Sequence, residues 1–332
     1  MDRQDLLSKI ADLTPENFGA VALEVFRFQA TGNKVYARFL ELLGKKPATV
    51  RDTLEIPFLP ISLFKSYSIQ TGNWDVQTVF TSSATTGQTP SKHRVRDLTA
   101  YLANTRLGFC SAYSDPSEWC TLALLPSYLE RSGSSLVAMA DYFIRLSPYA
   151  QSGFFLNDLN ALQATLFECI EKEIPTLLLG VSFALLDFAE QYPMDLSGIT
   201  IMETGGMKGR REELTRSALH RILCEAFNVP GIHSEYGMTE LFSQAYSQPR
   251  VGMDSRFVPG PLLQAVAREI NDPFAPVSYG RSGVLQFIDL ANLDTCSFLA
   301  TEDIGKVYPD GTFEVLGRLD AAELRGCNLM VE

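Results

Sequence analysis

The sequence predicts an α/β fold with a helical beginning and a β-rich C-terminal portion. Between residues 77 and 227, short apolar runs with strand character alternate with longer stretches of helical spacing, an order typical of α/β architectures. After residue 284, short strand-like segments follow one another and are separated by turn residues. A chain of 332 residues is long enough for one large domain or two moderate ones with a substantial core.

The N-terminal stretch, up to about Leu43, is expected to be helical. Leu6, Leu7, Ile10 and Leu13 fall on one face of a helix at the spacing of its turns. This face is the first candidate for the core.

The next segment is punctuated by prolines. Residues 56–66 read IPFLPISLFKS, and two prolines in an apolar run predict an extended, buried segment rather than a helix. Residues 77–81 have strand character, residues 81–93 are a loop of small polar residues, and residues 96–112 have helical spacing. The predicted order here is strand, loop, helix.

The remaining predicted elements complete the alternation. Strands are expected at residues 119–125, 176–179, 199–203, 284–289, 298–301, 306–308 and 312–316, and helices at 159–171, 183–190 and 212–227. The turn Pro309-Asp310-Gly311 lies between the last two strands and predicts a hairpin. We find no linker before about Gly317 and therefore interpret residues 1–316 as one domain and 317–332 as a short tail.

Charge and composition narrow the classes of function. The net charge is −11, from 28 Lys and Arg against 39 Asp and Glu, and no basic stripe offsets it, so a nucleic-acid partner is disfavoured. Residues 1–17 lack the pattern of a signal peptide, and no apolar run is long enough to cross a bilayer. The six cysteines form no C-x-x-C pair, so we expect reduced thiols, no metal cluster and a cytoplasmic location.

The strongest motif is TSSATTGQTPSKH, residues 81–93. Its Ser, Thr and Gly residues allow backbone N–H groups and hydroxyls to approach phosphate oxygens, and Lys92 adds a positive charge. The Walker pattern G-x-x-x-x-G-K-[ST] is missing, and a polar surface loop is the alternative interpretation.

A second motif is HSEYGMTELFSQ, residues 233–244. Tyr236 offers an aromatic face for stacking on a base, Thr239 a hydroxyl, and Glu240 a hard oxygen ligand suited to Mg²⁺. Taken alone, the motif is better explained as an ordinary strand-to-helix turn.

A third pair of motifs is TEDIG, residues 301–305, and LGRLDAAELRG, residues 316–326. Asp303 can accept hydrogen bonds from ribose hydroxyls, and Arg318 can reach phosphate or ribose. Taken alone, each is explained as a surface charge at a turn.

Together, and in this order, the motifs resemble those of the adenylate-forming superfamily of acyl-CoA synthetases, luciferases and adenylation domains. The resemblance spans roughly residues 50–330 and implies the layered sheets and helices of that superfamily's catalytic domain. It also implies ATP and Mg²⁺ as cofactors, with Glu240 as metal ligand and Lys92 and Thr239 as catalytic residues. The residues that it assigns to nucleotide binding are Ser82, Ser83, Thr85, Thr86, Gly87, Gly205, Gly206, Tyr236, Gly237, Asp303 and Arg318.

A closer similarity is to the acyl-protein synthetase subunit of the bacterial luminescence fatty-acid reductase complex. It rests on IPFLPISLFKS, on the loop that ends in SKH and on EYGMTELFSQ. This resemblance implies that a carboxylic acid, such as a fatty acid, becomes an acyl-AMP and then a thioester on a cysteine, for delivery to a reductase or carrier partner. Cys327 is the only cysteine after Arg318 and is the candidate nucleophile, with a buried structural cysteine as the alternative.

Three features depart from the superfamily pattern. Ala84 stands where the superfamily has glycine, and Lys92 follows Gly87 at a longer interval than usual. The sequence ends at Glu332, shortly after the hinge-like Arg318, so the mobile C-terminal domain with its catalytic lysine is expected to be absent or vestigial.

Two other functions stay open, and one is set aside. An acyl-CoA ligase would use CoA as the acceptor, and a non-catalytic partner subunit would bind the adenylate without making it. Gly180, Ser182 and Ala184 approximate the G-x-S-x-G elbow of α/β-hydrolases. That enzyme needs a late histidine, and the last one here is His233. The acid and the oligomeric state are not determined by the sequence.

Overall fold

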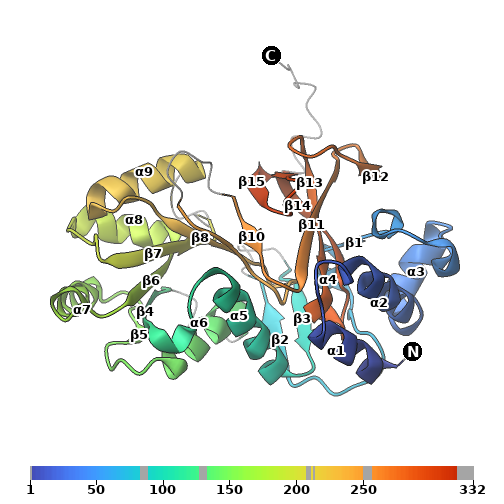
Figure 1. Ribbon diagram of the computed structural model, residues 1–332, viewed down its shortest axis with the longest axis horizontal. Helices are drawn as coiled ribbons and strands as arrows, with labels where there is room; N and C mark the ends of the chain where they lie inside the picture. The colour runs from blue at the N-terminus through green and yellow to red at the C-terminus, as the bar shows by residue number, and fades with distance from the viewer. Residues whose placement is uncertain are drawn as a thin grey trace, which may run out of the picture. The chain divides into compact units, whose positions relative to one another are not determined.

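The computed structural model describes residues 2–82, 89–126, 133–206, 211, 214–249 and 256–319. The chain divides into two compact units (Figure 1). Unit 1 contains the described parts of residues 2–63, 69–72 and 264–319, and unit 2 those of residues 64–68 and 73–263. The predicted boundary at about Gly317 stays a prediction, because the residues from 320 onward lie outside the described part.

Unit 2 is built on a seven-stranded, mainly parallel sheet. Its strands, in spatial order, are β10 (Val258–Pro259), β9 (Ala245–Ser247), β8 (His233–Tyr236), β7 (Ile199–Thr204), β6 (Thr176–Val181), β4 (Cys120–Leu124) and β5 (Gly153–Phe154). β9 and β10 are antiparallel additions at one edge. Every residue of β6 is buried, as expected of a parallel strand that is covered on both faces.

Helices cover both faces of this sheet. α8 and α9 lie together on one face, and α5 and α6 lie on the other (Figure 1). α7 is joined to the α8 side by a 2.5 Å hydrogen bond from the Tyr192 hydroxyl to Asn160. The bounds of these helices are α5 (Leu98–Ala112), α6 (Ser135–Leu146), α7 (Leu159–Glu171), α8 (Ser182–Gln191) and α9 (Arg216–Phe227).

The starts of four of these helices follow from the sequence. A side-chain oxygen just before each helix accepts hydrogen bonds from the first backbone N–H groups. These capping residues are Asp97, Ser134, Asp158 and Thr215.

The loop region before α5 corrects two predictions. The predicted order was strand, loop, helix, but a second strand, β3 (Lys92–Val95), pairs antiparallel with β2 (Thr78–Thr81). β3 alternates exposed and buried residues, and its two charged side chains hide that pattern in the sequence. Residues 59–60 form the extended strand β1, as predicted, but Leu63–Ser66 form one helical turn, α4.

Unit 1 contains a six-stranded, largely antiparallel sheet. β1 (Leu59–Pro60) pairs in parallel with β14 (Phe298–Val307). β14 also pairs with β15 (Phe313–Arg318) around Pro309-Asp310-Gly311, so the predicted hairpin is confirmed. The other strands are β13 (Ser282–Asp289), β11 (Leu263–Glu269) and β12 (Asp272–Pro276).

Two N-terminal helices of unit 1 pack on this sheet, because the rings of Phe26 and Tyr36 contact Phe298 of β14. In the first helix, the predicted core residues Leu6 and Ile10 are buried. The bounds of the N-terminal helices are α1 (Arg3–Ala11), α2 (Phe18–Gly32) and α3 (Lys34–Leu42). Short 3₁₀ turns complete the two units at Pro47–Thr49, Thr53–Glu55, Pro116–Glu118 and Leu290–Asn292. Within the described ranges, no helix is long and apolar enough to cross a membrane.

Candidate active site

Two predicted nucleotide loops leave the seven-stranded sheet side by side. β7 and β8 are adjacent and parallel, and Thr204 at the end of β7 lies opposite Glu235 near the end of β8. Gly205 and Gly206 continue β7, and Gly237 follows β8. Loops at the carboxyl ends of parallel strands are the usual place for ligands in α/β sheets. The register therefore brings these predicted residues to one edge of unit 2.

The Gly205–Gly206 loop is exposed, and a buried serine donates a hydrogen bond to it. Gly205 has a φ of +67°, a left-handed conformation that favours glycine. Its carbonyl accepts a 2.7 Å hydrogen bond from the Ser182 hydroxyl. Ser182 is only 2% exposed, so it is a support for this loop and not the accessible nucleophile of a hydrolase elbow.

Two buried glutamates lie under the same edge. Glu235 accepts a hydrogen bond from the Thr204 hydroxyl, and burial raises the pKa of Glu235 to about 7. A Cβ on Gly237 would lie 2.5 Å from Glu235 Oε1, so a larger residue there would require the Glu235 carboxyl group to move. Glu203 accepts a 3.2 Å hydrogen bond from Ser182 and lies 3.4 Å from the Nε2 atom of His220. This network holds the ends of β7 and β8 together.

The turn after β8 carries Thr239 and Glu240. It is closed by a 3.1 Å hydrogen bond from the Leu241 N–H to the Met238 carbonyl, and it leads into strand β9 instead of the helix expected from the local pattern. Glu240 is 5% exposed. No group of three His, Cys, Asp or Glu side chains that could hold a metal ion occurs among the described residues. A single carboxylate still suits Mg²⁺, which keeps waters and takes other ligands from substrate phosphates.

His93 contacts this turn, which the sequence analysis did not anticipate. Its Nδ1 atom lies 2.7 Å from the carbonyl oxygen of Thr239, and the side chain is fully buried. Burial lowers the pKa of His93 to about 4, so the ring is neutral near pH 7. The only signal in the sequence was its position directly after Lys92.

The base of the predicted phosphate loop is closed by two serines. The Ser82 N–H donates to the Ser91 carbonyl at 3.1 Å, and the Ser91 N–H donates to the Ser82 hydroxyl at 2.9 Å. Lys92 is exposed on β3 opposite Thr81. The predicted residues Ser83, Thr85, Thr86 and Gly87 lie outside the described residues, as does Ala84.

In unit 1, the predicted ribose residues are paired with each other. Asp303 on β14 lies directly opposite Arg318 on β15, with 4.0 Å between Arg318 Nε and Asp303 Oδ1. Arg318 also forms an ion pair with Glu302 at 3.1 Å. TEDIG is therefore part of a strand and not a turn. Cys327 lies outside the described residues.

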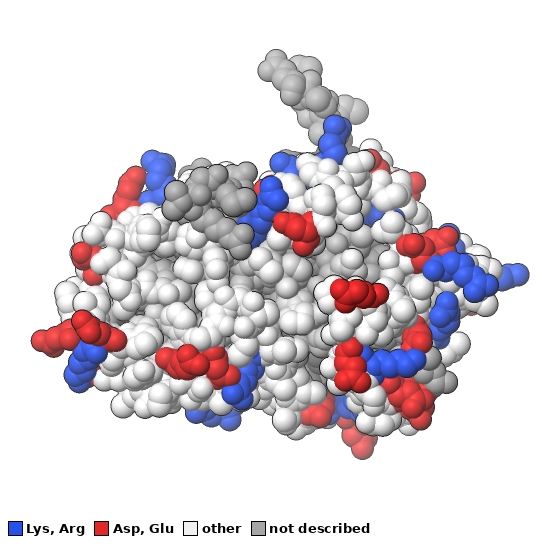
Figure 2. Space-filling view, in the orientation of Figure 1, with Lys and Arg blue, Asp and Glu red and all other residues white. Residues whose placement is uncertain are grey.

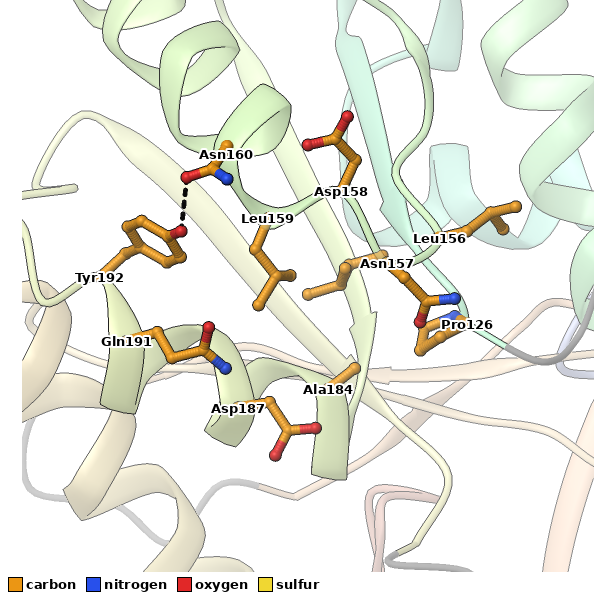
Figure 3. A pocket seen from close by; sticks show the side chains of 11 residues that line it. Pro126, Leu156, Asn157, Asp158, Leu159, Asn160, Ala184, Asp187, Gln191 and Tyr192 are labelled. Carbon is orange, nitrogen blue, oxygen red and sulfur yellow. Dashed lines mark hydrogen bonds between the residues drawn. The ribbon is translucent and has the colours of Figure 1, made fainter.

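A cavity of about 330 Å³ lies elsewhere on the unit 2 sheet (Figure 3). It opens at the end of β4, where β5 adjoins on one side and β6 on the other. It is lined by Asn157, Asp158 and Asn160 at the start of α7, by Asp187 and Gln191 of α8, and by Tyr192, which directly follows α8. None of the predicted site residues lines this cavity, so it is separate from the nucleotide loops.

The displayed face of the protein carries charged side chains of both signs (Figure 2). Acidic and basic side chains are interspersed on the displayed face, without a basic stripe among the described residues (Figure 2).

Sequence comparison gives two matches. Residues 174–332 match the family model of the acyl-protein synthetase LuxE. The chain is also 24% identical over 327 residues to the long-chain-fatty-acid–luciferin-component ligase of Vibrio harveyi, covering 92% of this chain and 84% of that relative. The predicted resemblance to the acyl-protein synthetases is confirmed.

Structural comparison shows the fold of adenylate-forming ligases. A 2-hydroxyisobutyryl-CoA ligase, solved with 2-HIB-AMP and CoA, matches with a TM-score of 0.67 at 13% identity. The match covers 91% of this chain and 70% of the ligase chain. ATP-bound MatB from Rhodopseudomonas palustris has a TM-score of 0.53 at 16% identity and covers 74% of this chain. The chain spans about half of MatB's length, 48%. The predicted α/β fold is confirmed, and the matches support the predicted class of acyl-adenylate-forming ligase.

Proposed function

We propose that the protein is an ATP-dependent ligase that activates a carboxylic acid as its acyl-adenylate and passes the acyl group to a thiol. The observation that carries the proposal is the β7–β8 register, which brings the Gly205–Gly206 loop beside the Tyr236–Gly237 segment. The match to the acyl-protein synthetase model and the fold of adenylate-forming ligases support it.

In the proposed first step, a carboxylate oxygen of the acid attacks the α-phosphorus of ATP and pyrophosphate leaves. Catalysis of this step consists mainly of positioning and of charge neutralisation. Thr239 would contact the α-phosphate, and Lys92 would neutralise charge at the leaving phosphates. The buried Glu240 carboxylate would hold Mg²⁺, which supplies charge neutralisation between phosphate oxygens when it is bound.

The remaining predicted residues would hold the nucleotide. Tyr236, Gly205, Gly206 and Gly237 would border the adenine, and Asp303 with Arg318 would contact the ribose. The β- and γ-phosphates would be held by the loop residues Ser82, Ser83, Thr85, Thr86 and Gly87.

In the proposed second step, a thiolate attacks the carbonyl carbon of the acyl-AMP. A carbon–sulfur bond forms, the carbon–oxygen bond to the phosphate breaks, and AMP leaves. We propose Cys327 as the thiol and a reductase or carrier protein as the final acceptor. The name of the Vibrio harveyi relative favours a long-chain fatty acid as the substrate.

The adenylation step is tested by pyrophosphate–ATP exchange driven by a series of fatty acids of increasing chain length. We expect exchange that requires both an acid and Mg²⁺ and that increases with chain length before it reaches a plateau. Absence of exchange with every acid would overturn the proposal and favour the non-catalytic partner subunit.

The acceptor is tested with radiolabelled acid and ATP. Label that survives denaturation of the wild-type protein and disappears in Cys327→Ser would identify the nucleophile. Cys110→Ser is the control, because Cys110 is an exposed cysteine outside the predicted site. Label retained in Cys327→Ser would exclude this residue.

An acyl-CoA ligase is the second candidate, because the 2-hydroxyisobutyryl-CoA ligase with this fold was solved with CoA. The same experiment separates the two functions. Label that never remains on the protein and appears only on added CoA would favour the CoA ligase.

A further inference from the structure

The contact between His93 and Thr239 joins two motifs that lie 146 residues apart in the chain. His93 follows Lys92 on β3. Directly before this strand, Ser91 exchanges hydrogen bonds with Ser82 and closes the base of the predicted phosphate loop. The other partner, Thr239, precedes Glu240 in the turn after β8. Both belong to unit 2, so the contact lies within one compact body.

The ring of His93 is held in one orientation by its neighbours. It stacks on Phe242, with 4.5 Å between ring centroids and 26° between planes, and it meets the edge of Phe64 at 5.4 Å. Phe242 is held in turn by Tyr101 at 5.2 Å. A locked ring directs a hydrogen bond better than a mobile one, because little rotational freedom is lost when the bond forms.

The chemistry of the contact fixes the direction of the hydrogen bond. A carbonyl oxygen only accepts, so Nδ1 must carry the proton and donate to Thr239. The bond uses the main chain of Thr239 and leaves its side-chain hydroxyl out of the contact. In the neutral ring, the single proton is therefore on Nδ1.

We infer that His93 is a positioning residue that holds the Thr239–Glu240 turn against the base of the phosphate loop. This inference rests on the proposed function, in which Thr239 and Glu240 contact the α-phosphate and Mg²⁺. His93 touches neither group and acts through the Thr239 carbonyl. The hydroxyl and the carboxylate are thereby set in place before the nucleotide binds, which lowers the cost of ordering them during the reaction.

A buried ring in an aromatic cluster also contributes to the core, and two substitutions separate that contribution from positioning. His93→Phe keeps an aromatic ring and removes the donor. His93→Asn loses the ring but keeps an N–H donor at the same number of bonds from the backbone as Nδ1. Tyr101→Phe is the matched control, because it removes a 3.0 Å hydrogen bond to the Ser135 carbonyl in the same cluster without touching the turn.

The variants are compared by acid-dependent pyrophosphate–ATP exchange and by thermal unfolding. We expect His93→Phe to raise KM for MgATP about tenfold and to lower kcat about tenfold or more, with KM for the acid unchanged. His93→Asn should recover most of the MgATP affinity although it packs less well, and Tyr101→Phe should keep wild-type kinetics. Equal KM values for MgATP in His93→Phe and Tyr101→Phe, or no recovery in His93→Asn, would overturn the inference.

Two further measurements separate this inference from the proposed function and from folding defects. If the wild type shows no exchange, the proposed function fails. The positioning role of His93 is then tested by calorimetric titration with MgATP. Weaker MgATP binding in His93→Phe than in Tyr101→Phe supports that role. Equal binding, or none in the wild type, overturns it. In the wild type, ¹⁵N NMR of His93 at pH 7 should show a neutral ring with its proton on Nδ1, and a proton on Nε2 alone would contradict the inference.

Discussion

The two sheets of this protein use polar side chains in opposite ways. In unit 2, the central strands β4 and β6 are buried along their whole length and mostly apolar, and polar side chains gather where β7 and β8 end. In unit 1, the buried polar groups lie between helices and strands and join them. Gln29 of α2 donates to the carbonyls of Asn292 and Leu293 at 3.0 Å, and its Oε1 atom accepts from the Ser297 N–H.

Buried polar side chains therefore have different roles in the two units. Asn33 donates to the Thr295 carbonyl at 2.9 Å, and Arg268 donates to the carbonyls of Phe274 and Leu54. All of these hydrogen-bond partners lie within unit 1. By contrast, Glu203 and Glu235 lie beneath exposed glycine loops in unit 2. Buried polar groups that join elements stabilise the fold, whereas those under open loops set the geometry of a site.

The largest expected effect is on catalysis and lies in unit 2. Glu240→Gln keeps the size of the side chain and removes its charge, so we expect exchange to fall about a hundredfold or more while the melting temperature changes little. Glu168→Gln is the control, because Glu168 is a partly exposed glutamate of the same unit that pairs with Lys172. If Glu240→Gln exchanges at the rate of the control, the Glu240 carboxylate is not needed for adenylation.

The next effect is on stability and lies in unit 1. Gln29→Met keeps a similar volume and leaves the carbonyls of Asn292 and Leu293 and the Ser297 N–H without this partner. We expect the free energy of unfolding to fall by about 3 kcal/mol or more, measured by urea denaturation, with kcat of the folded enzyme unchanged. A change in kcat with little change in stability would show that unit 1 polarity is not mainly structural.

An effect of similar size is expected from Glu235, and it depends on pH. Burial raises the pKa of Glu235 from 4.5 to about 7, so the folded state holds a proton that the unfolded state releases between these values. The contribution of Glu235 to stability is therefore lost as pH rises through about 7. Glu235→Gln, which stays neutral, should be more stable than the wild type by about 3 kcal/mol at pH 8 and equal to it below pH 4.5.

Both the wild type and Glu235→Gln contain His93, whose pKa is lowered to about 4. Its contribution therefore cancels when their free energies of unfolding are subtracted at each pH. That histidine acts with the opposite sign, because the unfolded state takes up its proton first as pH falls from 6.5. A difference between wild type and Glu235→Gln that does not vary with pH would show that Glu235 is ionised in the folded protein.

The smallest effect is expected at the surface of unit 1. Glu302 and Arg318 form an ion pair whose side chains are 44% and 62% exposed. Exposed pairs contribute little, so Glu302→Ala should change the free energy of unfolding by less than about 0.5 kcal/mol. A loss above 1 kcal/mol in urea denaturation would mean that this pair is part of the structural framework after all.

Sequence reasoning was accurate where one local pattern decided the outcome. The helix at Leu159–Glu171 and the strand that begins at Thr176 follow from spacing and from an uninterrupted apolar run. The strand β3 was missed because its four residues include two exposed or partly exposed charged side chains, Lys92 and Arg94, and a period of two is hard to recognise over so short a stretch.

The sequence motifs predicted the residues of the candidate site but not which of them lie side by side. The segments containing Gly205 and Tyr236 were both proposed to border a nucleotide, yet their adjacency depends on the order of strands in the sheet. The role of His93 was not predicted either, because it depends on a partner 146 residues away. Residues 83–88 and Cys327 lie outside the described part of the chain, so their assignments stay predictions.

Unit 1 is assembled from stretches at the two ends of the chain, and this has a consequence during synthesis. Arg3 pairs with Asp294 across 291 residues, and Phe26 of α2 packs against Phe298 of β14. On the ribosome, α1, α2 and α3 therefore emerge long before the strands that cover them. Unit 2 is encoded by a nearly continuous stretch and can fold first, whereas the early helices keep apolar surface open until β13 and β14 have been synthesised.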